Sequence, residues 1–197
     1  MICSRVNASR VHTDPASLAG DASNLHAQEK LRDGTTVLIR PIHGEDIELE
    51  RRFINGLSPE SRRFRFLGQL NEPTSEMLKR FTHPDPVRDV AFIALIADGP
   101  QKREIGVARY SANADGSACE CAVTVSDEWH NKGLATLLMR HLIKIARERG
   151  IGGMYSIDAA DNAAMSDLAA HMGFERKVDP DDAAQVIHTL NLKTASV

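Results

Sequence analysis

The sequence has few cysteines and few aromatic residues, and it has no long apolar or basic run. Its 197 residues include three cysteines (Cys3, Cys119 and Cys121), and aromatic side chains make up 5% of the chain. No apolar stretch approaches the roughly 20 residues that a membrane-spanning helix needs, so no membrane role is expected. The net charge of -3 is not accompanied by a basic cluster, so we expect no nucleic-acid partner.

The cysteine count bears on the compartment and on metal binding. An odd number of cysteines, without a recognisable secretory signal, predicts reduced thiols and a cytoplasmic location. Cys119 and Cys121 lie in an apolar stretch and are expected to fill the core. A single Cys-x-Cys without a second ligand pair predicts no metal site. The length and the 42% apolar content favour one globular domain.

The hydrophobic pattern changes along the chain. Residues 1–30 are polar and without sustained periodicity, which predicts a flexible, poorly ordered arm or a short helix that packs on a partner subunit of a homodimer. Residues 31–197 are expected to form the domain, with helix starts at Gly44, Ser58 and Thr74. Further helices are expected over 134–150 and 161–172. Strands are expected over 36–42, 90–97, 104–110, 118–125, 154–157, 174–178 and 186–192. This order predicts a mixed α/β (α+β) domain.

The most informative segment is the turn His130-Asn131-Lys132-Gly133-Leu134-Ala135, between a strand and a long amphipathic helix. The first amides of a helix lack internal partners and lie at the positive end of its dipole. Small residues at 133 and 135 allow an anion to approach the backbone closely. Lys132 would add a cation. The alternatives are a simple turn at Gly133 and an ordinary surface lysine at 132.

This segment resembles the GNAT superfamily of N-acetyltransferases, whose signature is Gln/Arg-x-x-Gly-x-Gly/Ala. The match here is His130-x-x-Gly133-x-Ala135, and His130 departs from the family preference. Asn162-Ala163-Ala164-Met165 followed by Gly173-Phe174 resembles a second family segment. The resemblance covers roughly residues 35–192. It implies acetyl-CoA as cofactor and a GNAT fold: a central, twisted, mostly antiparallel sheet of six to seven strands flanked by helices, splayed between the fourth and fifth strands.

Within the superfamily, the chain looks most similar to the protein-lysine acetyltransferase type. The stretches that carry this similarity are Ile39-Arg40-Pro41-Ile42, Leu57-Ser58-Pro59-Glu60-Ser61, and Phe174 with Asp179-Pro180-Asp181-Asp182. The implied function is transfer of an acetyl group from acetyl-CoA to a primary amine, first of all a protein lysine. A small-molecule amine acceptor and a non-catalytic acyl-CoA sensor are the alternatives.

Glu120 is the candidate general base. A lysine ammonium has a pKa near 10.4, so a base must remove its proton before acyl transfer. Glu120 is a lone carboxylate in an apolar stretch, where desolvation raises a carboxyl pKa toward the working range. The resemblance also places the base on this strand. The alternative is a salt-bridged, structural glutamate. The position where the superfamily often has a tyrosine general acid is Ala169 here.

The resemblance also implies a set of cofactor contacts. The backbone near Val123 would polarise the thioester carbonyl and, with Val125, hold the pantetheine arm. Asn162 would reach the cofactor, cap a helix, or do both. The full expected set is Val123, Val125, His130, Asn131, Lys132, Gly133, Leu134, Ala135, Thr136 and Asn162.

Overall fold

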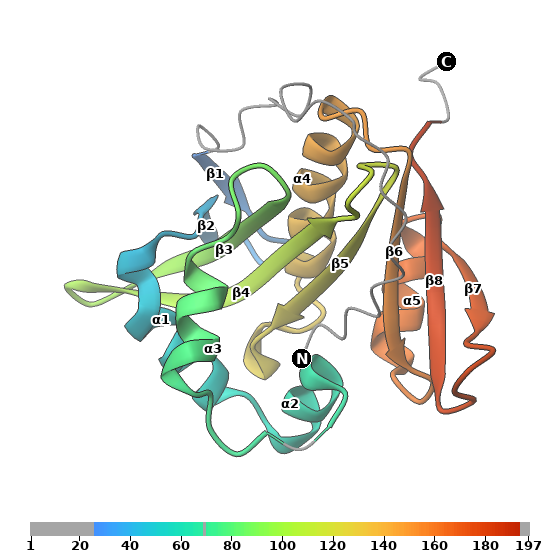
Figure 1. The fold of residues 1–197 in the computed structure, drawn as a ribbon. Coiled ribbons are helices and arrows are strands. Elements are labelled where there is room, and N and C mark those ends of the chain that lie inside the picture. Colours follow the sequence, from blue (N-terminus) through green and yellow to red (C-terminus); the bar gives the residue numbers. More distant parts are fainter. Residues whose placement is uncertain (1–25, 69, 194–197) are drawn as a thin grey trace.

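A computed structural model describes residues 26–68 and 70–193. In this part of the chain, eight strands form one sheet in the order β1-β2-β3-β4-β5-β6-β8-β7 (Figure 1). The strands are β1 Ala27–Lys30, β2 Thr36–Pro41, β3 Asp89–Asp98, β4 Gln101–Ala112, β5 Ala118–Val125, β6 Gly153–Ala159, β7 Glu175–Val178 and β8 Gln185–Asn191. The helices are α1 Ile47–Gly56, α2 Pro59–Phe66, α3 Ser75–Thr82, α4 Leu134–Glu148 and α5 Ala163–His171, with 3-10 turns η3 Gly44–Asp46 and η4 Asp127–Trp129.

The helix boundaries follow from the capping residues in the sequence. The Ser58 hydroxyl accepts a hydrogen bond from the Ser61 N–H at 3.1 Å and begins α2. The Thr74 hydroxyl accepts from the Met77 N–H at 3.2 Å and begins α3. Gly150, with φ of 73°, follows the end of α4, where a left-handed residue is favoured. The expected starts at Ser58 and Thr74 and the stop at Gly150 are therefore confirmed, whereas Gly44 begins the 3-10 turn η3 and α1 begins at Ile47.

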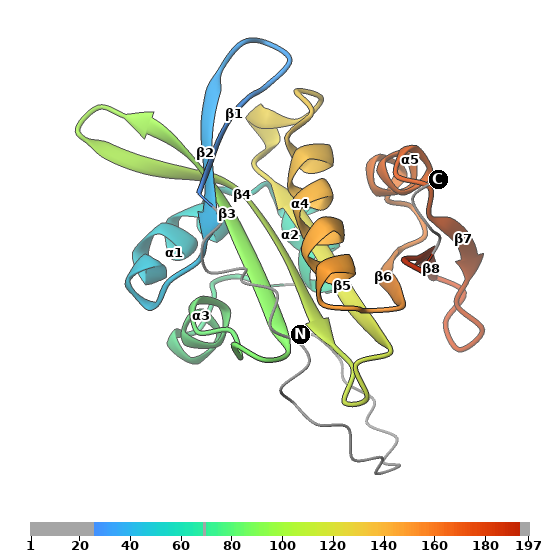
Figure 2. The ribbon, with the colours of Figure 1, turned by 90° about the horizontal axis from the view of Figure 1, so that it is seen from above.

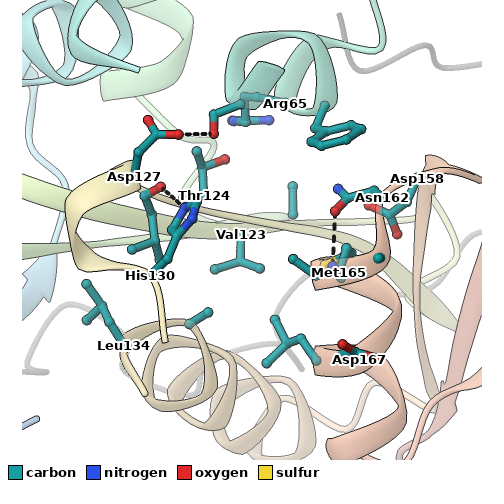
Figure 3. A pocket seen from close by; sticks show the side chains of 18 of the residues that line it. Arg65, Val123, Thr124, Asp127, His130, Leu134, Asp158, Asn162, Met165 and Asp167 are labelled. Carbon is teal, nitrogen blue, oxygen red and sulfur yellow. Dashed lines mark hydrogen bonds between the residues drawn. The ribbon is translucent and has the colours of Figure 1, made fainter. Parts of the chain in front are cut away.

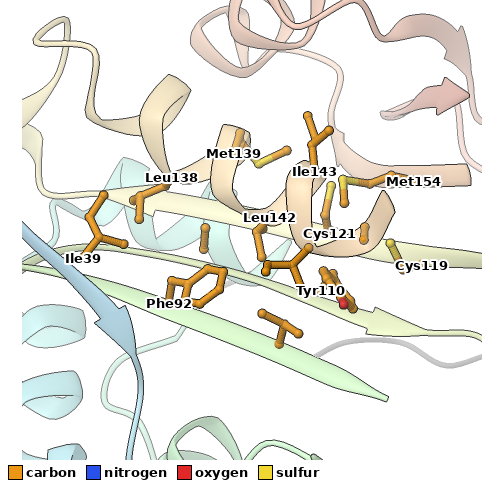
Figure 4. Close-up of a cluster of buried hydrophobic side chains, with 14 of the residues drawn as sticks. Ile39, Phe92, Tyr110, Cys119, Cys121, Leu138, Met139, Leu142, Ile143 and Met154 are labelled. Atoms are coloured by element: carbon orange, nitrogen blue, oxygen red, sulfur yellow. The ribbon is translucent and has the colours of Figure 1, made fainter. Parts of the chain in front are cut away.

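Helices cover both faces of the central strands. Helix α4 packs on one face of β3, β4 and β5, and α1 and α3 pack on the other (Figure 2). The larger core lies between α4 and the sheet (Figure 4). Cys119 and Cys121 are free thiols in this core, as expected. Burial raises the pKa of Cys119 to about 12, so that side chain stays a thiol.

The predicted start of the domain needs correction. Residues 27–30, which the polar composition placed in the arm, form β1 and pair antiparallel with β2, from Ala27 opposite Ile39 to Lys30 opposite Thr36. Residues 1–25 lie outside the described part of the chain. Because of β1, the sheet has eight strands rather than six to seven. The splay expected between the fourth and fifth strands consequently lies between β5 and β6.

This splay positions the site. Strands β5 and β6 pair in parallel at three positions, ending with Glu120 opposite Tyr155. Beyond that point β5 continues to Val125 and β6 continues to Ala159 without pairing to each other. A parallel pair needs a crossover, which α4 provides. The mouth of the gap therefore lies next to the start of α4.

A buried charged cluster links α1 to β4. Glu50 and Glu104 are 1% and 3% exposed, and Glu50 Oε1 lies 3.4 Å from Arg109 Nη2. Neither carboxylate oxygen of Glu104 has a hydrogen-bond partner among the described residues. Burial, and then the neighbouring Glu50 charge, hold the pKa of Glu104 well above its ordinary value. Both effects favour the protonated form of Glu104 in the folded protein.

We expect Glu104→Gln to stabilise the protein at neutral pH. A carboxyl with a raised folded-state pKa binds its proton more tightly when folded, so stability falls as pH rises above the unfolded-state pKa. Glutamine removes this penalty, and the free energy of unfolding should rise by about 1 kcal/mol or more. Urea unfolding at several pH values measures it. The matched Glu50→Gln variant should lose about 3 kcal/mol, because it leaves Arg109 unpaired.

Candidate active site

A cleft of about 680 Å³ opens where β5 and β6 separate (Figure 3). Its walls come from α2, β5, the turn before α4, β6 and α5. Of the eleven residues expected at the site, ten line this cleft: Glu120, Val123, Val125, His130, Asn131, Gly133, Leu134, Ala135, Thr136 and Asn162. Lys132 does not. Segments that lie more than 40 residues apart in the sequence therefore line the same cleft.

The turn before α4 presents free amides. Gly133 is the N-cap residue, has φ of 88° and makes no side-chain cap. The first α4 amide that is bonded is that of Leu137, which donates to the Gly133 carbonyl at 3.1 Å. The N–H groups of Leu134, Ala135 and Thr136 have no acceptor among the described residues. These donors at the positive end of a 15-residue helix fit an anion such as a diphosphate.

His130 is anchored to β5. Its Nε2 lies 3.0 Å from the carbonyl oxygen of Val125. A carbonyl only accepts, so Nε2 carries the proton, and Nδ1 is the free nitrogen. His130 therefore braces the turn against the strand at the position where related sequences prefer glutamine or arginine. It also occupies the Val125 carbonyl, which leaves Val123 as the freer backbone site.

The backbone of Val123 faces the splay. The Ser126 N–H donates to the Ile105 carbonyl of β4, and the Ala118 carbonyl accepts from the Asn113 N–H. Peptide groups alternate between the two edges of a strand, so even-numbered residues here bond to β4. The main-chain groups of Val123 consequently point to the edge of β5 that β6 has left. An extended chain lying in the cleft could pair with them.

The positive charge at the turn comes from an unexpected residue. Lys132 Nζ is 3.1 Å from Asp33 Oδ2 and 4.2 Å from the centre of the Trp129 ring. Arg32, in the turn between β1 and β2, lines the cleft, and its Nε would lie 3.4 Å from a Cβ placed on Gly133. The Arg32 N–H also donates to the Lys132 carbonyl at 3.2 Å. Lys132 therefore secures the β1–β2 turn, and Arg32 is the cation next to the free amides.

Asn162 caps α5, as one of its two expected roles requires. Its Oδ1 accepts a hydrogen bond from the Met165 N–H at 3.1 Å. The side-chain amide nitrogen has no partner among the described residues, and Asn162 lines the cleft. Capping thus leaves the Asn162 NH2 group free to donate to a ligand.

Glu120 lies at the closed end of the splay and is half-buried. No ion pair or hydrogen bond joins Glu120 to another described side chain. The alternative of a structural, salt-bridged glutamate therefore has no support in this part of the chain. Burial, and then the negative charge of Asp158, raise the pKa of Glu120. A carboxylate in this setting is a stronger base than one in water.

A second cavity of about 610 Å³ also reaches Glu120. It lies between the loop after α3 and strands β3, β4 and β5, and its lining includes Asp85, Asp89 and Arg109. Four residues line both cavities: Phe81, Glu120, Cys121 and Ala122. Glu120 therefore lies where the two cavities meet.

Helix α2 forms one rim of the cleft. Asp127 Oδ1 accepts hydrogen bonds from the hydroxyls of Ser58 and Ser61 at 2.7 and 2.8 Å. Arg63 Nη2 lies 2.8 Å from Asp161 Oδ2, which joins α2 to the loop before α5. Arg65, also on α2, packs 5.7 Å from the Phe81 ring centre. Burial lowers the pKa of Arg65 to about 10.

No tyrosine lines the cleft, so none is placed there to act as a general acid. Ala169 is 1% exposed and belongs to the core, so it offers no hydroxyl to the cleft. Tyr110 is 2% exposed, and burial raises its pKa. Tyr155 lies opposite Glu120 on β6, and burial raises its pKa too. Neither tyrosine lines the cleft.

The comparisons with known proteins agree with this geometry. A model of the Acetyltransferase (GNAT) family matches residues 61–174. An acetyltransferase of Pseudomonas aeruginosa is 47% identical over 177 residues, which cover 90% of this chain and 93% of that protein. The chain belongs to the GNAT family of acetyltransferases. It is accordingly an enzyme that uses acetyl-CoA.

Solved structures extend the comparison. The GNAT domain of S. lividans PAT superimposes with a TM-score of 0.77 at 29% identity, covering 84% of this chain and 96% of that one. The PaiA N-acetyltransferase of Thermoplasma acidophilum, solved in complex with coenzyme A, gives a TM-score of 0.63 at 17% identity over 79% of this chain and 98% of that one. The first likeness supports the GNAT assignment, and the second shows the shared fold.

Metal binding and membrane spanning can also be checked for the described residues. No group of three or more histidine, cysteine, aspartate or glutamate side chains in this part of the chain could hold a metal ion. None of the described helices is long and apolar enough to cross a membrane.

Proposed function

We propose that this GNAT enzyme transfers the acetyl group of acetyl-CoA to a primary amine, and that this amine is the side chain of a protein lysine. Glu120 is the general base. The observation that carries the proposal is the position of Glu120, at the junction of two cavities. One cavity leads to the anion-binding turn at Gly133, and the other opens beside the loop after α3. An anionic donor in one cavity and an amine acceptor in the other can then meet at one carboxylate.

The residues present fit the donor. The free amides of Leu134, Ala135 and Thr136, with Arg32 beside them, suit a diphosphate. The outward backbone of Val123 suits the amides of a pantetheine arm, as an added strand would pair. The Val123 N–H is then the donor that polarises the thioester carbonyl.

The chemistry assigned to Glu120 is proton removal. The Glu120 carboxylate takes one proton from the substrate ammonium, which frees the nitrogen lone pair. The nitrogen forms a bond to the carbonyl carbon as the carbon–sulfur bond breaks. The remaining excess proton on nitrogen passes to the sulfur, so the products are the acetylated amine and the CoA thiol. No tyrosine is needed in this scheme.

Two features support a lysine of a protein as the acceptor. The second cavity gives the acceptor its own approach to Glu120, the point where the two cavities meet. The solved GNAT domain at 29% identity covers nearly the whole folded unit, and the sequence stretches quoted above resemble the lysine-modifying type. A side chain reaching in from a protein surface would fit an approach of this kind.

The test is acetylation of cell-lysate proteins by the purified enzyme and acetyl-CoA, followed by mass spectrometry. The expected result is acetyl-lysine at defined sites, absent when Glu120→Gln replaces the native enzyme. In parallel, thiol release is measured with amino acids and polyamines. Turnover with small amines and none with proteins would replace lysine by a small-molecule acceptor. Tight acetyl-CoA binding without turnover on any amine would contradict the enzymatic proposal.

The role of Arg32 can be tested separately. Arg32→Gln should weaken acetyl-CoA binding about tenfold, because a charge-assisted contact to phosphate is lost. Isothermal titration calorimetry measures the affinity. Arg140→Gln is the matched control, since it removes one exposed charge from α4 away from the cleft. Equal affinities for the two variants would remove Arg32 from the donor site.

A further inference from the structure

Asp158 on β6 is a second carboxylate in the cleft, and its orientation is fixed. Its Oδ2 accepts a hydrogen bond from the Ser156 hydroxyl at 2.6 Å and lies 2.9 Å from His188 Nδ1. Oδ1 has no hydrogen-bond partner among the described residues. One oxygen is thus held by two partners while the other has none among the described residues, and Asp158 lines the cleft (Figure 3).

The residues behind Asp158 are deeply buried. Ser156 and His188 are each 1% exposed, and they lie opposite each other on β6 and β8. A carboxylate accepts hydrogen bonds, so His188 Nδ1 carries the proton that it donates. His188 Nε2 is buried without a partner among the described residues. Burying an imidazole nitrogen without a partner costs free energy of folding. The interaction that this buried ring makes is the hydrogen bond that holds Asp158.

Asp158 stands close to the expected point of chemistry. The last paired residues of β5 and β6 are Glu120 and Tyr155, and three residues further along lie Val123 and Asp158 on the two separating strands. Figure 3 places Val123 and Asp158 on facing walls. The Asp158 charge is near enough to act on Glu120. Two carboxylates and one free backbone amide therefore border the same part of the cleft.

We propose that Asp158, fixed by Ser156 and His188, binds the ammonium group of the acceptor and holds it between Asp158 and Glu120. The inference rests on the proposed function and narrows its substrate class to amines that arrive as cations. A fixed carboxylate binds an ammonium with a charge-assisted hydrogen bond. Asp158 therefore binds the ammonium group, and Glu120 then removes a proton from it.

The decisive variant is Asp158→Asn, which keeps the side-chain shape and removes the charge. The acceptors are n-butylamine and poly-L-lysine, which are cationic at about pH 8, and hydroxylamine, which is uncharged there. For the two cations, kcat/KM should fall about 10- to 100-fold, mainly through KM. With hydroxylamine, kcat/KM should stay within about twofold, and so should acetyl-CoA affinity.

Two companion variants separate charge from structure. Ser156→Ala keeps the charge and removes one restraint on Oδ2, so it should raise KM for the cations by a smaller factor than Asp158→Asn. Asp167→Asn removes one exposed carboxylate of the cleft wall on α5 and should leave KM unchanged. Circular dichroism melting of each variant identifies any loss of folding.

Each remaining outcome counts against the inference. An equal loss with hydroxylamine would mean that Asp158 acts on the reaction or the fold rather than on the ammonium. Weaker acetyl-CoA binding with an unchanged amine KM would assign Asp158 to the donor instead. A native preference for hydroxylamine over both cations would also overturn it. A native enzyme that acetylates no amine would sink the proposed function, which is a distinct result.

Discussion

Glu120→Gln is expected to lower kcat/KM for the amine by about 100- to 1,000-fold, the usual contribution of a positioned general base. Glutamine has nearly the same shape but cannot take up a proton. Acetyl-CoA affinity should change by less than about twofold, because the variant loses the proton-removal step and keeps every contact to acetyl-CoA. Steady-state thiol release and calorimetry measure the two quantities. Glu60→Gln, an exposed change on the α2 rim of the same cleft, is the matched control.

The pH dependence gives this prediction a second readout. Burial raises the pKa of Glu120 above its ordinary value of 4.5. Since the base acts as the carboxylate, kcat/KM should fall as the pH drops through this raised pKa. Asp158→Asn removes a negative charge that favours the protonated form, so it should move this acid limb to lower pH. Full turnover of Glu120→Gln at every pH would exclude Glu120 from the mechanism.

Local signals in the sequence were sufficient for most elements of the fold. The hydroxyls of Ser58 and Thr74 cap the helices that they were expected to start. The helical spacing from Leu134 onward, followed by Gly150, predicted α4. These features depend on neighbours a few residues apart, which is why they can be recognised in a single chain. The splay itself came from the resemblance, because strand order is not a local property.

The first strand could not be predicted in the same way. Residues 27–30 are Ala-Gln-Glu-Lys, which have little preference for a strand. They become β1 by pairing with β2, and the turn that follows is held by Asp33 and Lys132. The position of Arg32 next to Gly133 depends on this contact across about 100 residues. The motif therefore pointed to Lys132, whereas the cation next to the amides is Arg32.

The carboxylate at Asp158 left a signal that sequence reasoning missed. Ser156 and Asp158 alternate with apolar residues in the same way as the isolated Glu120 does, and His188 follows the apolar pair Val186-Ile187 in β8. Each was visible as a polar residue in a strand. Their pairing was not, because β6 and β8 are neighbours only through the sheet order. A buried polar residue predicts that a partner exists, without saying which residue it is.

Gly133→Asp is expected to reduce acetyl-CoA affinity by about 100-fold or more, since it places a carboxylate among the amides that fit a diphosphate. Gly133 has φ of 88°, and aspartate and asparagine tolerate positive φ better than other residues with side chains. A Cβ at this position would meet Arg32 atoms at 3.4 to 3.7 Å, which is ordinary contact. The turn can therefore keep its shape while its charge is reversed.

Gly133→Asn isolates the charge, because it adds the same bulk and the same backbone strain without the carboxylate. We expect its affinity to lie between that of Gly133→Asp and that of the native enzyme. Gly99→Asp is the control for charge and strain, since Gly99 has φ of 58° with nothing within 4 Å and lies in the β3–β4 turn. Calorimetry with acetyl-CoA ranks the series. If Gly133→Asp binds as tightly as Gly99→Asp, the diphosphate does not lie at this turn, and Glu120 loses its place beside the thioester.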